Sequence, residues 1–79
     1  MVSAVVLVNT DVGEENKVLE SVKNLQEVEE AHALWGVYDL VIKVKANSID
    51  GLKETIKSGL EQVAGISNVL TLMIVEIPP

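Results

Sequence analysis

The chain has 79 residues with six Lys, no Arg and 12 acidic residues, which gives a formal net charge of −6. A domain this small buries only about 60% of the surface of its unfolded chain, and because the sequence has no Cys and one His, association is favoured over disulfides or a metal as added support. A negative chain repels phosphate backbones, so direct binding of nucleic acid is not expected.

The first two elements predicted along the chain are a strand and a helix. Residues 3–9 form a short Val-rich run, typical of a strand buried on both faces. Three apolar residues then recur at helical spacing on one stripe: Val18, Val22 and Leu25. This spacing predicts a helix over residues 12–25, and Asp11 followed by Glu14 matches a capping box at its start.

Two strands of a hairpin are predicted next, over residues 29–35 and 39–45, on either side of Gly36. In the second strand, apolar and polar residues alternate, so that one face is formed by Leu40, Ile42 and Val44. Glu29 and Glu30 are adjacent, so the same alternation predicts that their carboxylates point to opposite faces and do not form an acid/base pair.

A second helix and a last strand complete the chain. Apolar residues step by three and four over residues 49–63, which predicts an amphipathic helix with Asn47 or Ser48 as its N-cap. Gly65 suits the end of that helix. Residues 68–77 form an apolar run that predicts a strand ended by two Pro residues.

The order strand, helix, strand, strand, helix, strand predicts an α+β, ferredoxin-like βαββαβ domain over residues 1–79. Its four-stranded antiparallel sheet has both helices on one face. Because the first and last strands are apolar on both sides, the other face needs a cover, and a twofold homodimer with facing sheets supplies one. The alternative is a surface with isolated aliphatic side chains.

Few side chains suit a cofactor, a metal or catalysis. His32 has no second His or Cys to complete a metal site, and no cofactor is expected. Phosphate-binding loops and nucleophile elbows are absent from the sequence. A secretion signal or an apolar run long enough to span a membrane is also absent, so a cytoplasmic location is expected.

The stretch Gly36-Val37-Tyr38-Asp39 carries the most specific resemblance in the sequence. Together with the alternating strand after it and the later "VAGISNVLT", it resembles the effector-binding domain of the Lrp/AsnC transcription regulators, often called RAM (regulation of amino-acid metabolism). The likeness covers almost the whole chain. Regulators of that family also carry a helix-turn-helix domain, for which these residues leave no room, so the chain looks like a stand-alone sensor module.

The resemblance implies a homodimer with facing sheets, further assembly into a ring such as an octamer, and an amino-acid effector bound between dimers. It places the ligand site at Gly36, Val37, Tyr38, Asp39 and Thr71. Asp39 would accept the ligand ammonium, while backbone N–H groups near Gly36 and the hydroxyl of Thr71 would donate to its carboxylate. Tyr38 would line the pocket or donate its hydroxyl.

Two departures from the family pattern bear on the ligand. Many relatives have a polar residue where Val37 stands and a Thr or Ser where Val69 stands, so the ligand has an apolar side chain, binds more weakly, or the site has lapsed. Gly36 and Asp39 also suit a turn without a ligand. Trp35 and Tyr38 suit packing or an interface.

The predicted function is therefore amino-acid sensing and oligomerisation, exerted through the chain's own assembly or by joining full-length regulators of the same family. An alternative is a small enzyme of the dimeric α+β barrel type, such as a monooxygenase or isomerase, with His32 or Asp39 as acid/base. A third is an oligomerisation domain without a ligand.

Overall fold

The computed structural model describes residues 2–74 of the chain. Its elements are β1 (Val2–Thr10), α1 (Glu15–Lys23), β2 (Val28–Ala33), β3 (Leu40–Ala46), α2 (Ile49–Glu54) and β4 (Ile66–Met73). After Glu54 the second helix continues as a π-helical segment, Thr55–Gly59, and a 3₁₀ turn, Leu60–Gln62. The predicted order of elements is confirmed, and residues 75–77 of the predicted last strand lie outside the described residues.

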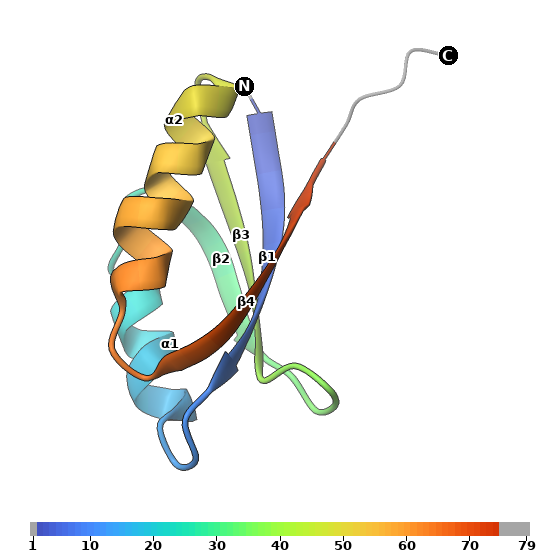
Figure 1. The fold of residues 1–79 in the computed structure, drawn as a ribbon, viewed down its shortest axis with the longest axis vertical. Helices are drawn as coiled ribbons and strands as arrows, with labels where there is room; N and C mark the ends of the chain where they lie inside the picture. Colours follow the sequence, from blue (N-terminus) through green and yellow to red (C-terminus); the bar gives the residue numbers. More distant parts are fainter. Residues whose placement is uncertain (1, 75–79) are drawn as a thin grey trace.

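The sheet has the order β2-β3-β1-β4, and every neighbouring pair is antiparallel. The two helices lie on the same face of this sheet (Figure 1). This arrangement confirms the predicted ferredoxin-like α+β fold. Because β1 and β3 are the central strands, β2 and β4 are left as the two edges. None of the helices among residues 2–74 is long and apolar enough to cross a membrane.

The core lies between the helices and the covered sheet face. Alternate residues of β1 and β3 point into it and are fully buried: Ala4, Val6, Val8, Leu40, Ile42 and Val44. Helical side chains close it from above: Val18, Val22, Leu52, Ile56 and Leu60. At about 25 cal/mol per Å² of apolar surface, this burial is the main stabilising term of so small a chain.

The N-termini of the two helices form differently from one another. Ser48 caps α2 as predicted, because its Oγ accepts the backbone N–H of Gly51 at 3.0 Å. The capping box predicted from Asp11 and Glu14 is wrong, since Glu14 itself is the N-cap and makes no side-chain capping bond. Asp11 lies in the preceding turn, where its backbone N–H donates to the carbonyl of Gly65 at 2.8 Å.

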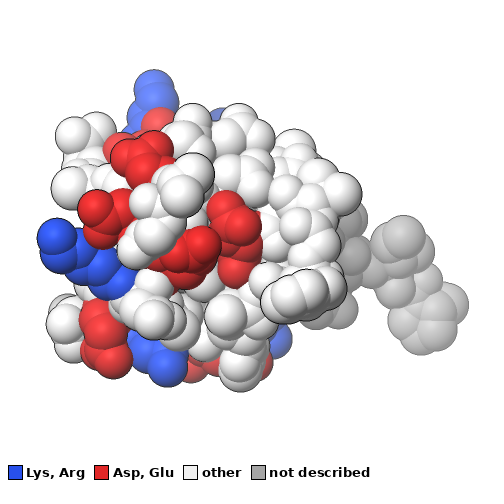
Figure 2. Space-filling model, turned by 90° about the horizontal axis from the view of Figure 1, so that it is seen from below, with Lys and Arg blue, Asp and Glu red and all other residues white. Residues whose placement is uncertain are grey.

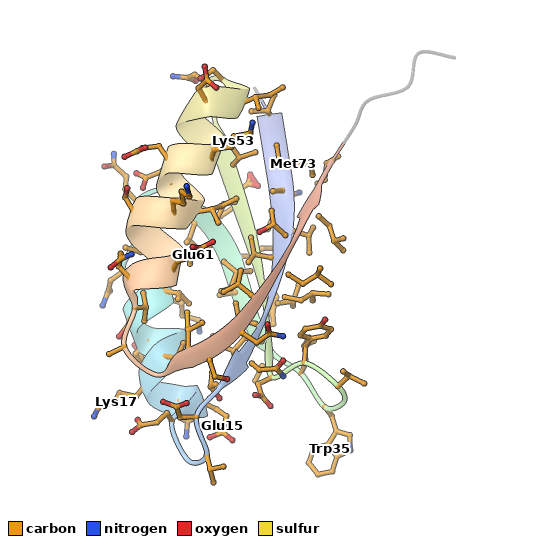
Figure 3. The ribbon with its side chains drawn as sticks, viewed as in Figure 1. Glu15, Lys17, Trp35, Lys53, Glu61 and Met73 are labelled. Atoms are coloured by element: carbon orange, nitrogen blue, oxygen red, sulfur yellow. The ribbon has the colours of Figure 1, made fainter. Side chains whose placement is uncertain are left out.

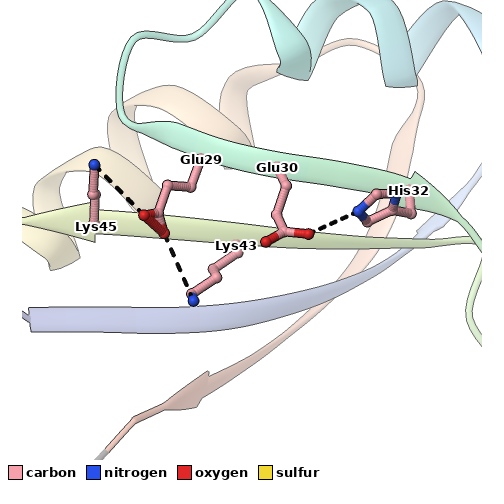
Figure 4. Close-up of polar contacts among 5 residues, drawn as sticks. All are labelled: Glu29, Glu30, His32, Lys43 and Lys45. Carbon is pink, nitrogen blue, oxygen red and sulfur yellow. Dashed lines mark hydrogen bonds and ion pairs between the residues drawn. The ribbon is translucent and has the colours of Figure 1, made fainter.

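A bulge in β2 changes the direction of Glu29. The pairing of β2 with β3 shifts register between Val28 and Glu30. The carboxylate of Glu29 lies 3.7 Å from the Nζ of Lys43 and 3.5 Å from that of Lys45, and Glu30 pairs with Lys43 in the strand register (Figure 4). The expectation that the two carboxylates point to opposite faces is therefore wrong, because the extra residue of a bulge interrupts strict alternation.

The sheet face away from the helices is apolar over β1 and β4. Six aliphatic side chains share it by strand register: Val5, Leu7, Val41, Leu70, Leu72 and Ile74. Three of them are 40% or more exposed, namely Leu70, Leu72 and Ile74. The predicted apolar surface on the uncovered face is thus confirmed.

Candidate ligand site

The loop that joins β2 to β3 carries four of the five predicted ligand-binding residues. Its base is closed by the backbone N–H of Leu34, which donates to the carbonyl of Asp39 at 2.8 Å. The N–H of Asp39 donates to the carbonyl of Val8 in β1 at 2.9 Å, so the loop is tied to the central strand. Gly36 has a φ of +157°, at the limit of what a residue with a β-carbon adopts readily.

Only one of the two carboxylate oxygens of Asp39 accepts hydrogen bonds within residues 2–74. Its Oδ2 accepts the backbone N–H of Thr10 at 2.8 Å and the Thr10 hydroxyl at 3.4 Å. Asp39 therefore has a structural role, but its carboxylate ties the loop to β1 rather than accepting N–H bonds of its own turn as predicted. Over residues 2–74, no donor of the protein reaches its second oxygen, Oδ1, which leaves one acceptor for a ligand.

Two asparagines that the sequence analysis did not identify support the loop. Asn9 donates from Nδ2 to the carbonyl of Val37 at 2.8 Å, and Asn68 donates from Nδ2 to Oδ1 of Asn9 at 3.3 Å. The signal in the sequence was their position, because Asn9 is the last residue of the first apolar run and Asn68 is the first residue of the final one. The backbone of Val37 is fixed by this chain of amides, while its side chain is 86% exposed.

A shallow hollow of about 390 Å³ lies against the loop. It is lined by Glu15, Ala33, Leu34, Trp35, Gly36 and Asp39. Tyr38 is half-buried, whereas the side chain of Trp35 projects fully into solvent at the tip of the loop (Figure 3). The lining of the hollow therefore combines two carboxylate residues, Glu15 and Asp39, with a glycine and the aromatic Trp35.

Thr71 lies apart from the loop residues. It pairs with Val6 across β1 and β4, on the face of the sheet that the helices cover. There it lines a larger hollow of about 590 Å³ between the second helix and β4, together with Asp50, Lys53, Glu54, Ile56, Lys57, Glu61 and Met73. Of the five predicted ligand-binding residues, Gly36 and Asp39 therefore line the hollow at the loop and Thr71 lines the larger one, while Val37 and Tyr38 line neither.

Charge is distributed unevenly around these hollows. At the end of the molecule seen in Figure 2, acidic side chains lie over the middle and one side, with Lys side chains among them, and the other side is uncharged. On the uncovered sheet face, a hydrogen bond from His32, 2.8 Å from Oε1, holds the pKa of the Glu30 carboxyl below its usual 4.5, and Lys43 adds to the effect (Figure 4). No cluster of three or more potential metal ligands occurs within residues 2–74.

The fold defines a small domain of the ferredoxin-like α+β class with two surface hollows. The model of the family described as the Lrp/AsnC ligand binding domain matches residues 3–78, and the chain belongs to this family. The resemblance first indicated by Gly36-Val37-Tyr38-Asp39 is thereby confirmed. It is a family of ligand-binding domains, so a ligand-sensing regulatory role is supported.

Solved structures resemble the chain over most of its length. FFRP-DM1 is 31% identical, with a TM-score of 0.91, over 95% of this chain and 100% of that one. AsnC of E. coli is 25% identical, with a TM-score of 0.88, over 99% of this chain and 53% of that one. The transcriptional regulator NMB0573 of Neisseria meningitidis, solved as a complex with L-Met, shares the fold at 16% identity and a TM-score of 0.83, over 95% and 50%. A search of curated proteins found no match.

Proposed function

We propose that this chain senses an amino acid at the loop formed by Gly36, Val37, Tyr38 and Asp39, with Thr71 completing the site. The observation that carries the proposal is the free Oδ1 of Asp39, held beside a hollow by the bonds from Thr10. A fixed carboxylate that is only half satisfied is suited to accept a ligand ammonium, and charge-assisted hydrogen bonds of this kind are the stronger ones.

The remaining polar groups suit the other end of such a ligand. Backbone N–H groups beside Gly36 have no β-carbon in their way, since nothing in the structure lies within 4 Å of the position a β-carbon would take there. The hydroxyl of Thr71 can donate to a carboxylate. The relative NMB0573 was solved with L-Met, an amino acid with an apolar side chain, which agrees in kind with the apolar Val37 and Val69 of this chain.

Because Thr71 and Asp39 line different hollows, the proposed site needs two chains. We propose a homodimer through the apolar sheet face and a ring of such dimers, with the ligand held between chains. The aliphatic patch of β1 and β4 supports the dimer, since facing sheets bury such surfaces at ordinary spacing. We propose further that this chain acts on DNA through full-length regulators of the same family, which it joins.

The two residues named for the enzyme alternative, His32 and Asp39, fit ligand binding better than catalysis. His32 is exposed on the uncovered sheet face and bonded to Glu30, and half of the Asp39 carboxylate is engaged by Thr10. His32 and Asp39 line different hollows, so they do not work together on one substrate as an acid/base pair. The regulatory names of AsnC and NMB0573 agree with a role in binding.

A thermal-shift screen of the twenty amino acids at millimolar concentration tests the proposal. A ligand at 100 times its dissociation constant stabilises the folded state by about 2.7 kcal/mol, which is readily measured as a rise in Tm. We expect one or a few amino acids, those with apolar side chains first, to raise Tm. If none does while the oligomer is intact, the chain is not an amino-acid sensor.

A further inference from the structure

Two amide side chains lie at the end of the uncovered sheet face, next to the β2–β3 loop. Asn9 of β1 pairs with Asn68 of β4, two residues along from the pair formed by Leu7 and Leu70. By the two-residue period of a strand, the asparagines therefore continue the aliphatic rows of that face. Two amides at the end of an aliphatic row indicate a hydrogen-bonding role rather than a packing role.

The two side chains form a chain of hydrogen bonds, the amide relay, that ends on the backbone of the loop. Asn68 donates from Nδ2 to Oδ1 of Asn9 at 3.3 Å, and Asn9 donates from Nδ2 to the carbonyl of Val37 at 2.8 Å. Because a carbonyl oxygen only accepts, Asn9 has to present its NH₂ group to Val37, which leaves its oxygen for Asn68. The direction of the whole relay is thus set by its end point.

The loop does not need the relay in order to close. Its base is already held by the backbone bond from Asp39 to the carbonyl of Val8 and by the bond from the Thr10 N–H to the Asp39 carboxylate. Both of these bonds act at Asp39, the last residue before β3. The bond from Asn9 acts two residues earlier, at Val37, so it controls how the loop backbone is turned rather than whether the loop closes.

The relay orients one particular backbone donor, the N–H of Tyr38. This N–H and the Val37 carbonyl belong to one trans peptide, in which the two groups point in opposite directions. With the carbonyl held towards Asn9, the Tyr38 N–H has to point away from Asn9. No acceptor within residues 2–74 takes it. A hydrogen bond at the carbonyl also polarises the peptide, which makes its N–H a stronger donor.

We propose that Asn9 and Asn68 are positioning residues of the ligand site, an inference that rests on the function proposed above. They act through the peptide between Val37 and Tyr38, whose N–H would donate to the carboxylate of the bound amino acid. An amino acid carries its ammonium and its carboxylate on the same carbon, so the acceptor and the donor that hold it must be close neighbours. Asp39 and the Tyr38 N–H adjoin in the sequence, and bonds to a carboxylate are charge-assisted.

NMR tests the relay in the protein without ligand. The wild type should show a scalar coupling across the hydrogen bond between Nδ2 of Asn9 and the carbonyl carbon of Val37. Asn9→Asp keeps an oxygen for Asn68 but has no hydrogen to donate, so the amide nitrogen of Tyr38 should shift upfield. Asn9→Ala, which adds no charge, should shift it in the same direction, and Asn68→Ala should do so by a smaller amount.

The matched control is Asn24→Ala. Asn24 carries the same amide group at the C-cap of α1, where it is exposed and its side chain makes no hydrogen bond within residues 2–74. Its removal should change neither the coupling nor the Tyr38 resonance. Circular dichroism checks that all of the variants fold.

Titration calorimetry with L-methionine, the ligand in the NMB0573 structure, or with the amino acid that gives the largest thermal shift, supplies the second readout. Loss of one neutral hydrogen bond should weaken binding by about two- to tenfold in both Asn9 variants. Asn68→Ala should weaken it less, and Asn24→Ala should bind as the wild type does.

The outcomes separate the relay from the sensor function. Absence of the coupling in the wild type, or equal affinity of the wild type and both Asn9 variants, overturns the positioning role and leaves amino-acid sensing in place. If the wild type binds none of the twenty amino acids, the sensor function itself is overturned, and the ligand role of Asn9 and Asn68 falls with it.

Discussion

The carboxylate of Asp39 accepts the backbone N–H of Thr10 at 2.8 Å across 29 residues of sequence. This bond fixes the start of β3 to the end of β1, next to the backbone bond from Asp39 to Val8. The same aspartate therefore shapes the loop through Oδ2 and lines the hollow, while no donor within residues 2–74 reaches its Oδ1. A rigid carboxylate needs no reordering when a ligand binds, which favours affinity.

Replacement of Asp39 should separate its two roles. Asp39→Ala leaves the Thr10 N–H without its acceptor, and we expect the free energy of unfolding to fall by about 1–3 kcal/mol. Urea denaturation followed by circular dichroism measures this. Thr10→Val is the matched control, since it removes only the longer 3.4 Å hydroxyl contact and should cost no more than about 0.5 kcal/mol. Equal losses for both variants would contradict the importance of the backbone bond.

Gly65 should tolerate no side chain. Its φ is +98°, and a β-carbon there would lie 2.9 Å from Cγ2 of Val18, so Gly65→Ala combines backbone strain with a clash. We expect a loss of about 1–3 kcal/mol in unfolding free energy.

Gly59→Ala is a control variant for which the free energy of unfolding should rise rather than fall. Gly59 lies in the second helix, and a β-carbon there would meet only Cδ1 of Leu25, at 3.8 Å. Gly59→Ala should stabilise the chain by about 0.5–1 kcal/mol, because Ala is the better helix former. Thermal or urea unfolding of the two variants side by side decides the question, and a stabilising Gly65→Ala would refute the steric argument.

The apolar sheet face should govern the size of the particle. Leu72→Glu places a charge in the centre of the aliphatic patch, where Leu72 pairs with Val5, and should dissociate the dimer to chains of 8.5 kDa. Light scattering at micromolar concentration measures the mass. Val12→Glu adds the same charge at a fully exposed position away from the sheet and should leave the dimer intact. A monomeric wild type would remove the basis for the dimer.

The contact between Glu30 and His32 should make the stability of the fold depend on pH. The pKa of Glu30 is lowered in the folded chain by the hydrogen bond from His32, so the pair favours folding above the usual carboxyl pKa of 4.5. This contribution should be lost as the pH falls through the lower, folded pKa. NMR titration of the carboxyl carbon should give a higher pKa for Glu30 in His32→Ala than in the wild type. An unchanged value would mean that the contact is absent in solution.

Much of the fold followed from local patterns in the sequence. Alternation over Leu40, Ile42 and Val44 predicted the buried face of β3, and Ser48 was one of the two caps expected for the second helix. The capping box at Asp11 failed because a tertiary bond to Gly65 holds that residue in a turn. The predicted direction of the Glu29 side chain was wrong because β2 contains a bulge there. The alternation of apolar and polar residues in the sequence does not reveal a bulge.

The candidate site was harder to predict than the fold. The four loop residues could be placed together because they are consecutive in sequence, and they share the loop between β2 and β3. The position of Thr71 relative to these four residues could not be predicted. The spacing of residues along the sequence does not reveal which hollow each side chain lines in the folded chain. Asn9 and Thr10 were missed because their role depends on the lateral pairing of β1 with the loop.

The central claim is that Asp39 binds the ammonium of an amino acid with its charge, beyond its role in tying the loop to β1. Titration calorimetry at pH 7, with the amino acid that gives the largest thermal shift, compares the wild type with Asp39→Asn. Asn keeps an oxygen for the Thr10 N–H but has no charge, so the variant should fold and assemble normally and bind at least about tenfold more weakly. Equal affinity of the two proteins would contradict the account.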